Sequence, residues 1–285
     1  MICNICPRHC DISPGKTGAC RARMCIESAP EDEMNYKIIP VNYGKITSAA
    51  LDPIEKKPLR RFMPGSMILS VGSFGCNLTC PFCQNHRISM MDLKHSIYKT
   101  VTPPQLLDAA ETMKEAGNIG VAFTYNEPLI GYEYVIDCAK LIKGAGMNVV
   151  LVTNGFICEE PLTELLPYVD AMNIDLKAFN DDFYHGIGGD LNTVKQTIAL
   201  SARHCHVEVT TLVIPGENDS EEEMRIEAEW LADTSSCAGK DIPLHISRFF
   251  PAYAYADKEP TAVSKIYELA DIAKSSLKYV YTGNI

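Results

Sequence analysis

The sequence has no excess of positive charge and no long hydrophobic run. Its 26 lysine and arginine residues face 36 aspartate and glutamate residues, which gives a formal net charge of -10 and a pI near 5.2. A surface of this sign repels nucleic-acid phosphates, so we expect no nucleic-acid partner. No segment approaches the ~20 apolar residues of a membrane span, and the first residues lack an apolar signal region. These absences predict a cytoplasmic protein without a membrane anchor.

Cysteine, by contrast, is abundant. The chain of 285 residues is 46% hydrophobic, enough for a sizeable core, and it contains 12 cysteines. In a reducing compartment such thiols are metal ligands more often than disulfides. Most of them cluster within residues 1–25 and 76–83, and the single cysteines, which we expect to be small buried hydrophobes, are Cys138, Cys158, Cys205 and Cys237.

The most informative motif is Cys76-x3-Cys80-x2-Cys83, which follows the apolar run 67–71. One tight loop can turn three thiolates toward a single small inorganic core. A ferredoxin cubane takes four cysteines, whereas the next cysteine here is Cys138, in a predicted helix. We therefore expect a [4Fe-4S] cluster whose fourth iron is open to a substrate or cofactor. A structural zinc loop is the alternative.

A second cysteine group, Cys3-x2-Cys6-x3-Cys10-x9-Cys20, opens the chain. Prolines and glycines lie between these residues, and the segment has too few apolar residues to order itself, so we expect a metal to hold it. Zinc and an iron-sulfur cluster both fit four thiolates, and spacing does not choose between them. The alternative is a set of reduced thiols in a flexible tail, because Cys25 is an odd fifth member.

The hydrophobic pattern predicts three regions: a cysteine-rich metal-binding module at 1–30, a linker and hairpin at 31–65 with strands at 37–41 and 44–51, and a main domain at 66–285. In the main domain, predicted strands alternate with predicted helices. This alternation favours right-handed βαβ units and a barrel or part of one. The strands are expected at 67–71, 119–123, 148–152, 171–176, 206–214, 244–249 and 279–281, and the helices at 103–116, 130–143, 161–166, 191–203, 220–232 and 261–275.

Polar residues follow the predicted strands, where barrel enzymes place their working groups. We expect them to surround one ligand site. The alternative is ordinary loop chemistry, with a Thr-Asn-Gly turn and a simple ion pair between Asp175 and Lys177. Besides the cysteine loop the residues concerned are 124–128, Thr153, Asn154, Gly155, Asn173, Asp175, Lys177, Pro215, Gly216, His245, Ser247 and Arg248.

With Phe82 before its last cysteine, the loop resembles the signature of the radical SAM superfamily. Residues 67–251 resemble enzymes related to pyruvate formate-lyase activating enzyme. The N-terminal cysteines and the stretches TYNEP, TNGF and NIDLK are similar to the AmmeMemoRadiSam system radical SAM enzymes. The resemblance implies a partial (β/α)6 TIM-type barrel and a [4Fe-4S] cluster that S-adenosyl-L-methionine (SAM) chelates through its fourth iron.

The resemblance also implies a SAM site. In it, Glu127 would accept from the SAM amino group, and Lys177 would meet its carboxylate or ribose. Phe82 would lie beside the adenine. The full implied set is Phe82, Tyr125, Asn126, Glu127, Asn154, Asp175 and Lys177. An external electron donor such as flavodoxin or ferredoxin would serve the cluster.

The implied activity is reductive cleavage of SAM to a 5'-deoxyadenosyl radical, which abstracts hydrogen from a substrate. One candidate substrate is a glycyl radical enzyme, because two flanking amides delocalise a glycine Cα radical. A second is another protein or a small molecule, as for AmmeMemoRadiSam-like enzymes. A third reading is an iron-sulfur electron-transfer or zinc-stapled binding protein without enzymatic activity.

Three departures from the activase pattern bear on the substrate and on a cation. Val152 stands where the activase has an acidic residue that helps to hold a monovalent cation, so only Thr153 and Asp175 remain of that cation site. The activase has an arginine near Thr210, and a histidine is common near Phe250. We expect residues 247–253 to line the substrate side of the pocket, with contacts that differ from those of the activase.

Overall fold

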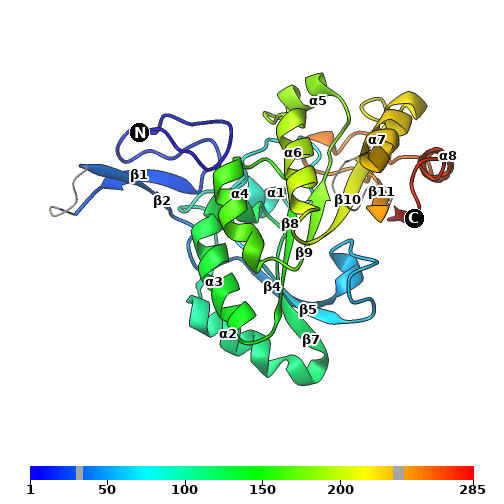
Figure 1. Cartoon of the computed structure of the whole chain (residues 1–285). Coiled ribbons are helices and arrows are strands. Elements are labelled where there is room, and N and C mark those ends of the chain that lie inside the picture. Colours follow the sequence, from blue (N-terminus) through cyan, green and yellow to red (C-terminus); the bar gives the residue numbers. More distant parts are fainter. Residues whose placement is uncertain (30–34, 234–240) are drawn as a thin grey trace.

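The computed structural model describes residues 1–29, 35–233 and 241–285, and one sheet of eight strands organises it (Figure 1). The strand order is β12-β11-β10-β9-β8-β7-β5-β4. Neighbours from β5 to β12 pair in parallel, and β4 pairs with β5 in the antiparallel sense at one edge. The strands are β4 (Ser48–Pro53), β5 (Met67–Gly72), β7 (Asn118–Phe123), β8 (Asn148–Thr153), β9 (Ala171–Asp175), β10 (His206–Val213), β11 (Leu244–Arg248) and β12 (Val280–Gly283).

Helices follow the parallel strands in sequence, which confirms the predicted partial barrel. Local chemistry sets their ends: Thr102 and Gln105 form a capping box before α2, and the chain leaves that region through Gly117 in the left-handed conformation, with φ of 85°. The helices are α1 (His86–Ser89), α2 (Pro103–Thr112), α3 (Tyr132–Gly144), α4 (Glu159–Leu165), α5 (Asp181–Gly186), α6 (Leu191–Ser201), α7 (Glu221–Asp233) and α8 (Val263–Ala273).

The N-terminal residues form a separate two-stranded ribbon beside the sheet (Figure 1). In it β1 (Arg23–Glu27) pairs with β2 (Tyr36–Pro40). The prediction of a hairpin between segments 37–41 and 44–51 is therefore wrong. Segment 48–53 instead extends the main sheet as β4, and β3 (Lys45–Ile46) pairs with β6 (Lys99–Thr100). Alternation identified both strands, but it carries no information on the partner of each.

The connection from β4 to β5 closes the floor of the barrel. Ile54 and Leu59 are fully buried, and they pack with Ile68, Ala122 and Val150 inside the sheet. Apolar side chains from the connection thus fill the interior at the floor, opposite the strand ends where polar residues are expected.

A buried carboxylate fastens this connection. Glu208 on β10 is 0% exposed, and its oxygens accept hydrogen bonds from the backbone amides of Arg60 (3.0 Å) and Arg61 (2.7 Å). The His206 and His245 rings lie 2.9 and 2.6 Å from the same carboxylate. Burial alone would raise the pKa of Glu208, but these four hydrogen bonds lower it to about 2.

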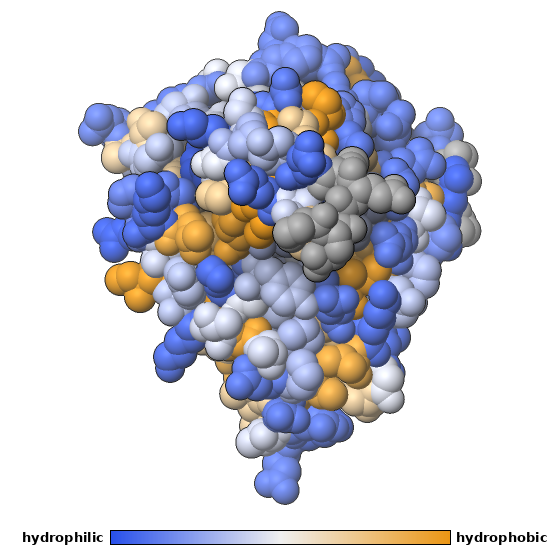
Figure 2. Space-filling model, turned by 90° about the vertical axis from the view of Figure 1, so that its left-hand side faces the viewer, coloured by the Kyte–Doolittle hydropathy of each residue, from blue (hydrophilic) through white to orange (hydrophobic). Residues whose placement is uncertain are grey.

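Outside the core, apolar residues are dispersed. Figure 2 views the molecule from the side of the β1–β2 ribbon and shows hydrophilic residues over most of this face, with apolar residues in small groups. Within the described ranges, no helix has both the length and the apolar character that a bilayer crossing requires.

Replacement of Glu208 by alanine should destabilise the fold strongly. Four polar partners at the floor would lose their acceptor, which we expect to lower the free energy of unfolding by about 3–5 kcal/mol. The folded pKa lies below the ordinary 4.5, so the stabilisation is present above that value and is lost as the pH falls through about 2. Urea unfolding at neutral pH, followed by circular dichroism, measures the change.

The matched control is Glu229→Ala on α7, which removes only an exposed ion pair with Arg225. We expect a change below about 1 kcal/mol there. Equal unfolding midpoints for the two variants would contradict the role of Glu208.

Candidate active site

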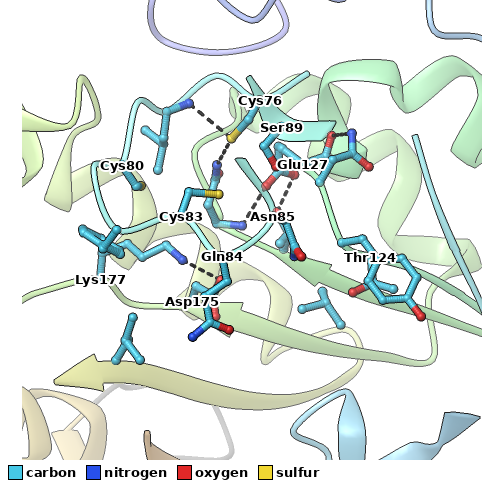
Figure 3. Close-up of a pocket in the computed structure, with 18 of the residues that line it drawn as sticks. Cys76, Cys80, Cys83, Gln84, Asn85, Ser89, Thr124, Glu127, Asp175 and Lys177 are labelled. Atoms are coloured by element: carbon cyan, nitrogen blue, oxygen red, sulfur yellow. Dashed lines mark hydrogen bonds and ion pairs between the residues drawn. The ribbon is translucent and has the colours of Figure 1, made fainter. Parts of the chain in front are cut away.

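A cavity of about 270 Å³, open to solvent, lies at the carboxyl ends of the parallel strands. Figure 3 shows the three cysteines on one side of it and Lys177 reaching toward Asp175. Every parallel strand from β5 to β11, or the loop after it, contributes to its wall. The predicted residues that line it are Cys76, Cys80, Phe82, Cys83, Tyr125, Asn126, Glu127, Thr153, Asn154, Asp175, Lys177 and Ser247.

The cysteine loop presents three unpaired thiols to this cavity. Cys76 Sγ accepts from the backbone amide of Leu78 at 3.4 Å and from Asn154 Nδ2 at 3.6 Å. Such N–H groups stabilise thiolate and cluster sulfur. Burial raises the pKa of Cys76, and that of Cys80 to about 11, so metal binding must displace protons. Among the described residues, no three metal-binding side chains stand close enough to share a single ion.

The position of the cysteine loop depends on Gly75 and Asn126. Gly75 has a φ of 86°, and a Cβ there would lie 2.5 Å from the carbonyl oxygen of Cys20. Asn126 Oδ1 accepts from the backbone amide of Ser73 at 2.8 Å, while its Nδ2 donates to the carbonyl of Gly75 at 3.1 Å. The side chain of Asn126 thus holds the chain that leads into Cys76.

Glu127 is a buried charged side chain of the wall, at 3% exposed. Its carboxylate accepts from the backbone amide of Leu129 (3.0 Å), the Thr153 hydroxyl (2.7 Å) and the backbone amide of Asn154 (2.8 Å). Burial raises the pKa of Glu127 to about 7 in spite of these three donors. A carboxylate can accept about four hydrogen bonds, which leaves one acceptor position for a ligand.

Asp175 and Lys177 form the charged part of the wall. Lys177 Nζ lies 2.6 Å from Asp175 Oδ2, so the simple ion pair considered from sequence does exist. Burial would lower the pKa of Lys177, but the Asp175 and Cys80 groups raise it above its usual value. Both side chains still face the cavity.

Two aromatic residues of the predicted site have different surroundings. Phe82 is buried in the wall, with its ring centroid 6.0 Å from Phe183 and 6.1 Å from Tyr255. Tyr125 has a left-handed backbone, with φ of 70°, and its hydroxyl donates to Asp52 Oδ2 at 2.8 Å. The hydroxyl of Tyr125 is therefore committed to the edge strand β4.

Several predicted rim groups lie elsewhere. His245 belongs to the floor with Glu208, Arg248 donates to the carbonyl of Thr261, and the fully buried Asn173 donates to the carbonyl of Pro58. Pro128, Gly155 and the Pro215–Gly216 turn are not part of the wall, and of the segment 247–253 only Ser247 is, so the expectation that this whole segment lines the pocket is wrong.

At the position of the activase cation site, Val152 lines the cavity without offering a ligand. The two remaining candidate ligands already have partners, because the Thr153 hydroxyl donates to Glu127 and Asp175 pairs with Lys177.

Sequence reasoning missed several wall residues. Four lie within seven residues of the third cysteine and could have been suspected from that position, whereas the others come from the interior of β10 and from the residue after β12. They are Gln84, Asn85, Ser89, Met90, Leu212 and Asn284, whereas the predicted residue Thr124 does line the cavity. Asn77, between the first two cysteines, was also missed: its Oδ1 accepts from Asn154 Nδ2 at 2.9 Å.

The family model of the radical SAM superfamily matches residues 70–227, which contain the cysteine loop and four of the parallel strands that follow it. The chain belongs to the radical SAM superfamily. It is 38% identical over 286 residues to an uncharacterized protein of Methanocaldococcus jannaschii, covering 99% of this chain and 81% of that one. It is 27% identical to pyruvate formate-lyase 1-activating enzyme of Escherichia coli, over 56% of this chain and 66% of the activase.

Solved radical SAM structures share the fold at low sequence identity. QueE from Escherichia coli superposes with a TM-score of 0.54 at 11% identity, over 84% of this chain and 92% of that one. SuiB from Streptococcus suis, bound to S-adenosylmethionine, gives a TM-score of 0.55 at 12% identity, over 73% of this chain and 48% of SuiB. These likenesses support the partial barrel.

The remaining cysteines divide into two groups. Cys3, Cys6, Cys10 and Cys20 line one small cavity in the N-terminal module, whereas Cys25 does not line it and packs in the ribbon with Cys3 and Ile12. Cys138 is fully buried in the main core, as expected for a lone cysteine, but Cys158 and Cys205 are only partly buried. Cys237 lies outside the described residues.

Removal of charge from the wall should weaken SAM binding. A charged hydrogen bond at a formed site is worth roughly 1.5–3 kcal/mol, so Lys177→Ala and Glu127→Ala should each raise the dissociation constant about tenfold or more. Isothermal titration of the anaerobic protein with SAM measures this. Lys114→Ala, at an exposed i,i+3 pair, is the control. Unchanged affinity in both wall variants would contradict the SAM assignment.

Proposed function

We propose that the protein binds a [4Fe-4S] cluster through Cys76, Cys80 and Cys83, binds SAM beside it, and abstracts a hydrogen atom from a substrate at the same rim. The supporting observation is that three unpaired thiols share one cavity with Glu127 and the Asp175–Lys177 pair. The cluster, when reduced, supplies the electron that splits the sulfonium to a 5'-deoxyadenosyl radical.

The residues of the chain position and shield this chemistry. The free acceptor position of Glu127 suits an ammonium group, and Lys177 suits a carboxylate or ribose hydroxyl. Phe82 and Leu78, both buried, form an apolar part of the wall that keeps water from a reactive radical. These assignments favour an enzyme over an electron-transfer or zinc-stapled binding protein, for which the polar wall has no use.

For the substrate we propose a glycine of a protein partner, as in activation of a glycyl radical enzyme. Aromatic residues stand exposed in the segment that follows the wall residue Ser247: Phe250 is 41% and Tyr253 45% exposed, and Tyr253 stacks on His86 at 4.7 Å, just after the cysteine loop. Exposed aromatic rings are typical anchors for a protein segment. The distant likeness to activases supports the same choice.

A second candidate is radical modification of another protein or of a small molecule, as for AmmeMemoRadiSam-like enzymes. The uncharged residues Val152, Thr210 and Leu212 of the wall favour it, because they offer an activase substrate or cation no charged partner. The archaeal relative also matches the N-terminal module, whereas the match to the activase covers little more than half of the chain. In either case, an external one-electron donor such as flavodoxin or ferredoxin would reduce the cluster.

Serine at Cys76, Cys80 and Cys83 should abolish the barrel cluster, because no other described thiol lines this cavity. We expect anaerobically reconstituted triple variant to lose the SAM-perturbed EPR signal and SAM cleavage together. Cys205→Ser, at a distant site, is the control. Retention of both signals by the triple variant would sink the cluster assignment.

Deuterium labelling of candidate substrates tests the choice between the two substrate classes. Glycyl radical enzyme partners that carry deuterium at glycine Cα should pass it to 5'-deoxyadenosine, detected by mass spectrometry, and show a doublet glycyl EPR signal. Cleavage of SAM without such transfer, but with label from another deuterated protein or metabolite, would replace glycyl activation by the second candidate.

A further inference from the structure

The N-terminal module contains a second cysteine-lined cavity, separate from the radical SAM site. Four thiols, those of Cys3, Cys6, Cys10 and Cys20, line this small cavity together with Arg8 and Arg23. Gly18 belongs to the same wall, and a Cβ there would lie 3.0 Å from Ile12 Cδ1 and 3.5 Å from Cys10 Sγ. A side chain at position 18 would therefore crowd Ile12 and touch Cys10 in the wall of the cavity.

Arg23 is the unusual member of this wall. It is 5% exposed, and its terminal nitrogens donate to the Glu133 carboxylate (2.9 and 2.6 Å) and the carbonyl of Ile130 (3.0 Å). Its Nε, however, is buried without a hydrogen-bond partner. A buried donor left unpaired costs about 1–3 kcal/mol, so a negatively charged occupant of the cavity would satisfy this group.

The same cavity adjoins the cysteine loop of the barrel. Arg8 Nε donates to the carbonyl of Asn77 at 2.7 Å. Asn77 directly follows Cys76, and Asn154 Nδ2 contacts both Asn77 Oδ1 (2.9 Å) and Cys76 Sγ (3.6 Å). Asn77 therefore contacts Arg8 in the wall of the second cavity and Asn154, which donates to Cys76, and in this way it links the two cysteine sets.

Two further contacts come from Arg21 and Cys20 of the module. Arg21 Nη1 donates to the carbonyl of Cys76 at 3.3 Å, and the carbonyl of Cys20 packs on Gly75. Gly75 and Cys76, at the start of the cysteine loop, thus both contact residues at or next to the second cavity. Short covalent and hydrogen-bonded paths of this kind suit electron transfer between two centres.

We propose that Cys3, Cys6, Cys10 and Cys20 hold an iron-sulfur cluster that relays electrons to the barrel cluster. The relay rests on the proposed function. A low-potential one-electron donor protein loses one electron, the N-terminal cluster takes it and passes it on, and the barrel cluster is reduced by one electron; no proton or bond changes at the relay. Zinc at the same cysteines could not act in this way, because it has no accessible redox change.

The first test is metal content of the full-length protein, purified and reconstituted anaerobically. Wild type should hold about eight iron atoms per chain, since each cubane contains four. The double variant Cys3→Ser/Cys6→Ser and the single variant Cys10→Ser should each hold about four. Cys25→Ala, in the same module but outside the cavity, should match wild type. Zinc, or no second metal, in wild type would overturn the proposal.

The second test is the rate of reduction of the barrel cluster, followed by freeze-quench EPR. With reduced flavodoxin as donor, Cys3→Ser/Cys6→Ser should be at least tenfold slower than wild type, while dithionite should still produce the SAM-perturbed barrel signal. That signal also shows that the barrel is folded. Equal rates with flavodoxin would overturn the relay. Absence of the barrel signal from wild type would instead refute the proposed function.

Discussion

The rim of the barrel depends on one buried carboxylate. Glu127 receives hydrogen bonds from its own loop and from the loop after β8, so the ends of two neighbouring strands are joined through a single side chain. Asn126, the preceding residue, holds the approach to the cysteine loop. Two consecutive residues after β7 therefore set the relative positions of three loops. The arrangement needs burial, because water would compete for each of these bonds.

Much of this could be predicted from sequence. Strand and helix periodicity located all seven parallel strands and their main helices, because βαβ order leaves few alternatives. The residues at the strand ends were also found, since parallel strands bring their carboxyl ends to one edge. Failures arose where a residue's height along its strand decides its role: His245 and Ser247 lie two positions apart on the same face of β11, yet the first serves the floor and only the second lines the cavity.

Other features were not predictable because they depend on distant pairing. Asn77 gave no periodic signal, and its importance follows only from contacts with the N-terminal module and Asn154. Similarly, five cysteines in 25 residues left Cys25 ambiguous. The ribbon explains it, because strand β1 places Cys25 in its own small core, away from the cavity that the other four line.

The hydrogen bonds around the cysteine loop have a consequence for how the enzyme is matured. The loop is held by Asn126 and Asn154 of the barrel, and Arg8 and Arg21 of the N-terminal module donate to its backbone carbonyls. Most of the conformational entropy of this loop is therefore already lost when the chain folds. For the proposed barrel cluster, iron and sulfide would then bind a loop that is already ordered, so cluster insertion would follow the folding of the barrel rather than drive it.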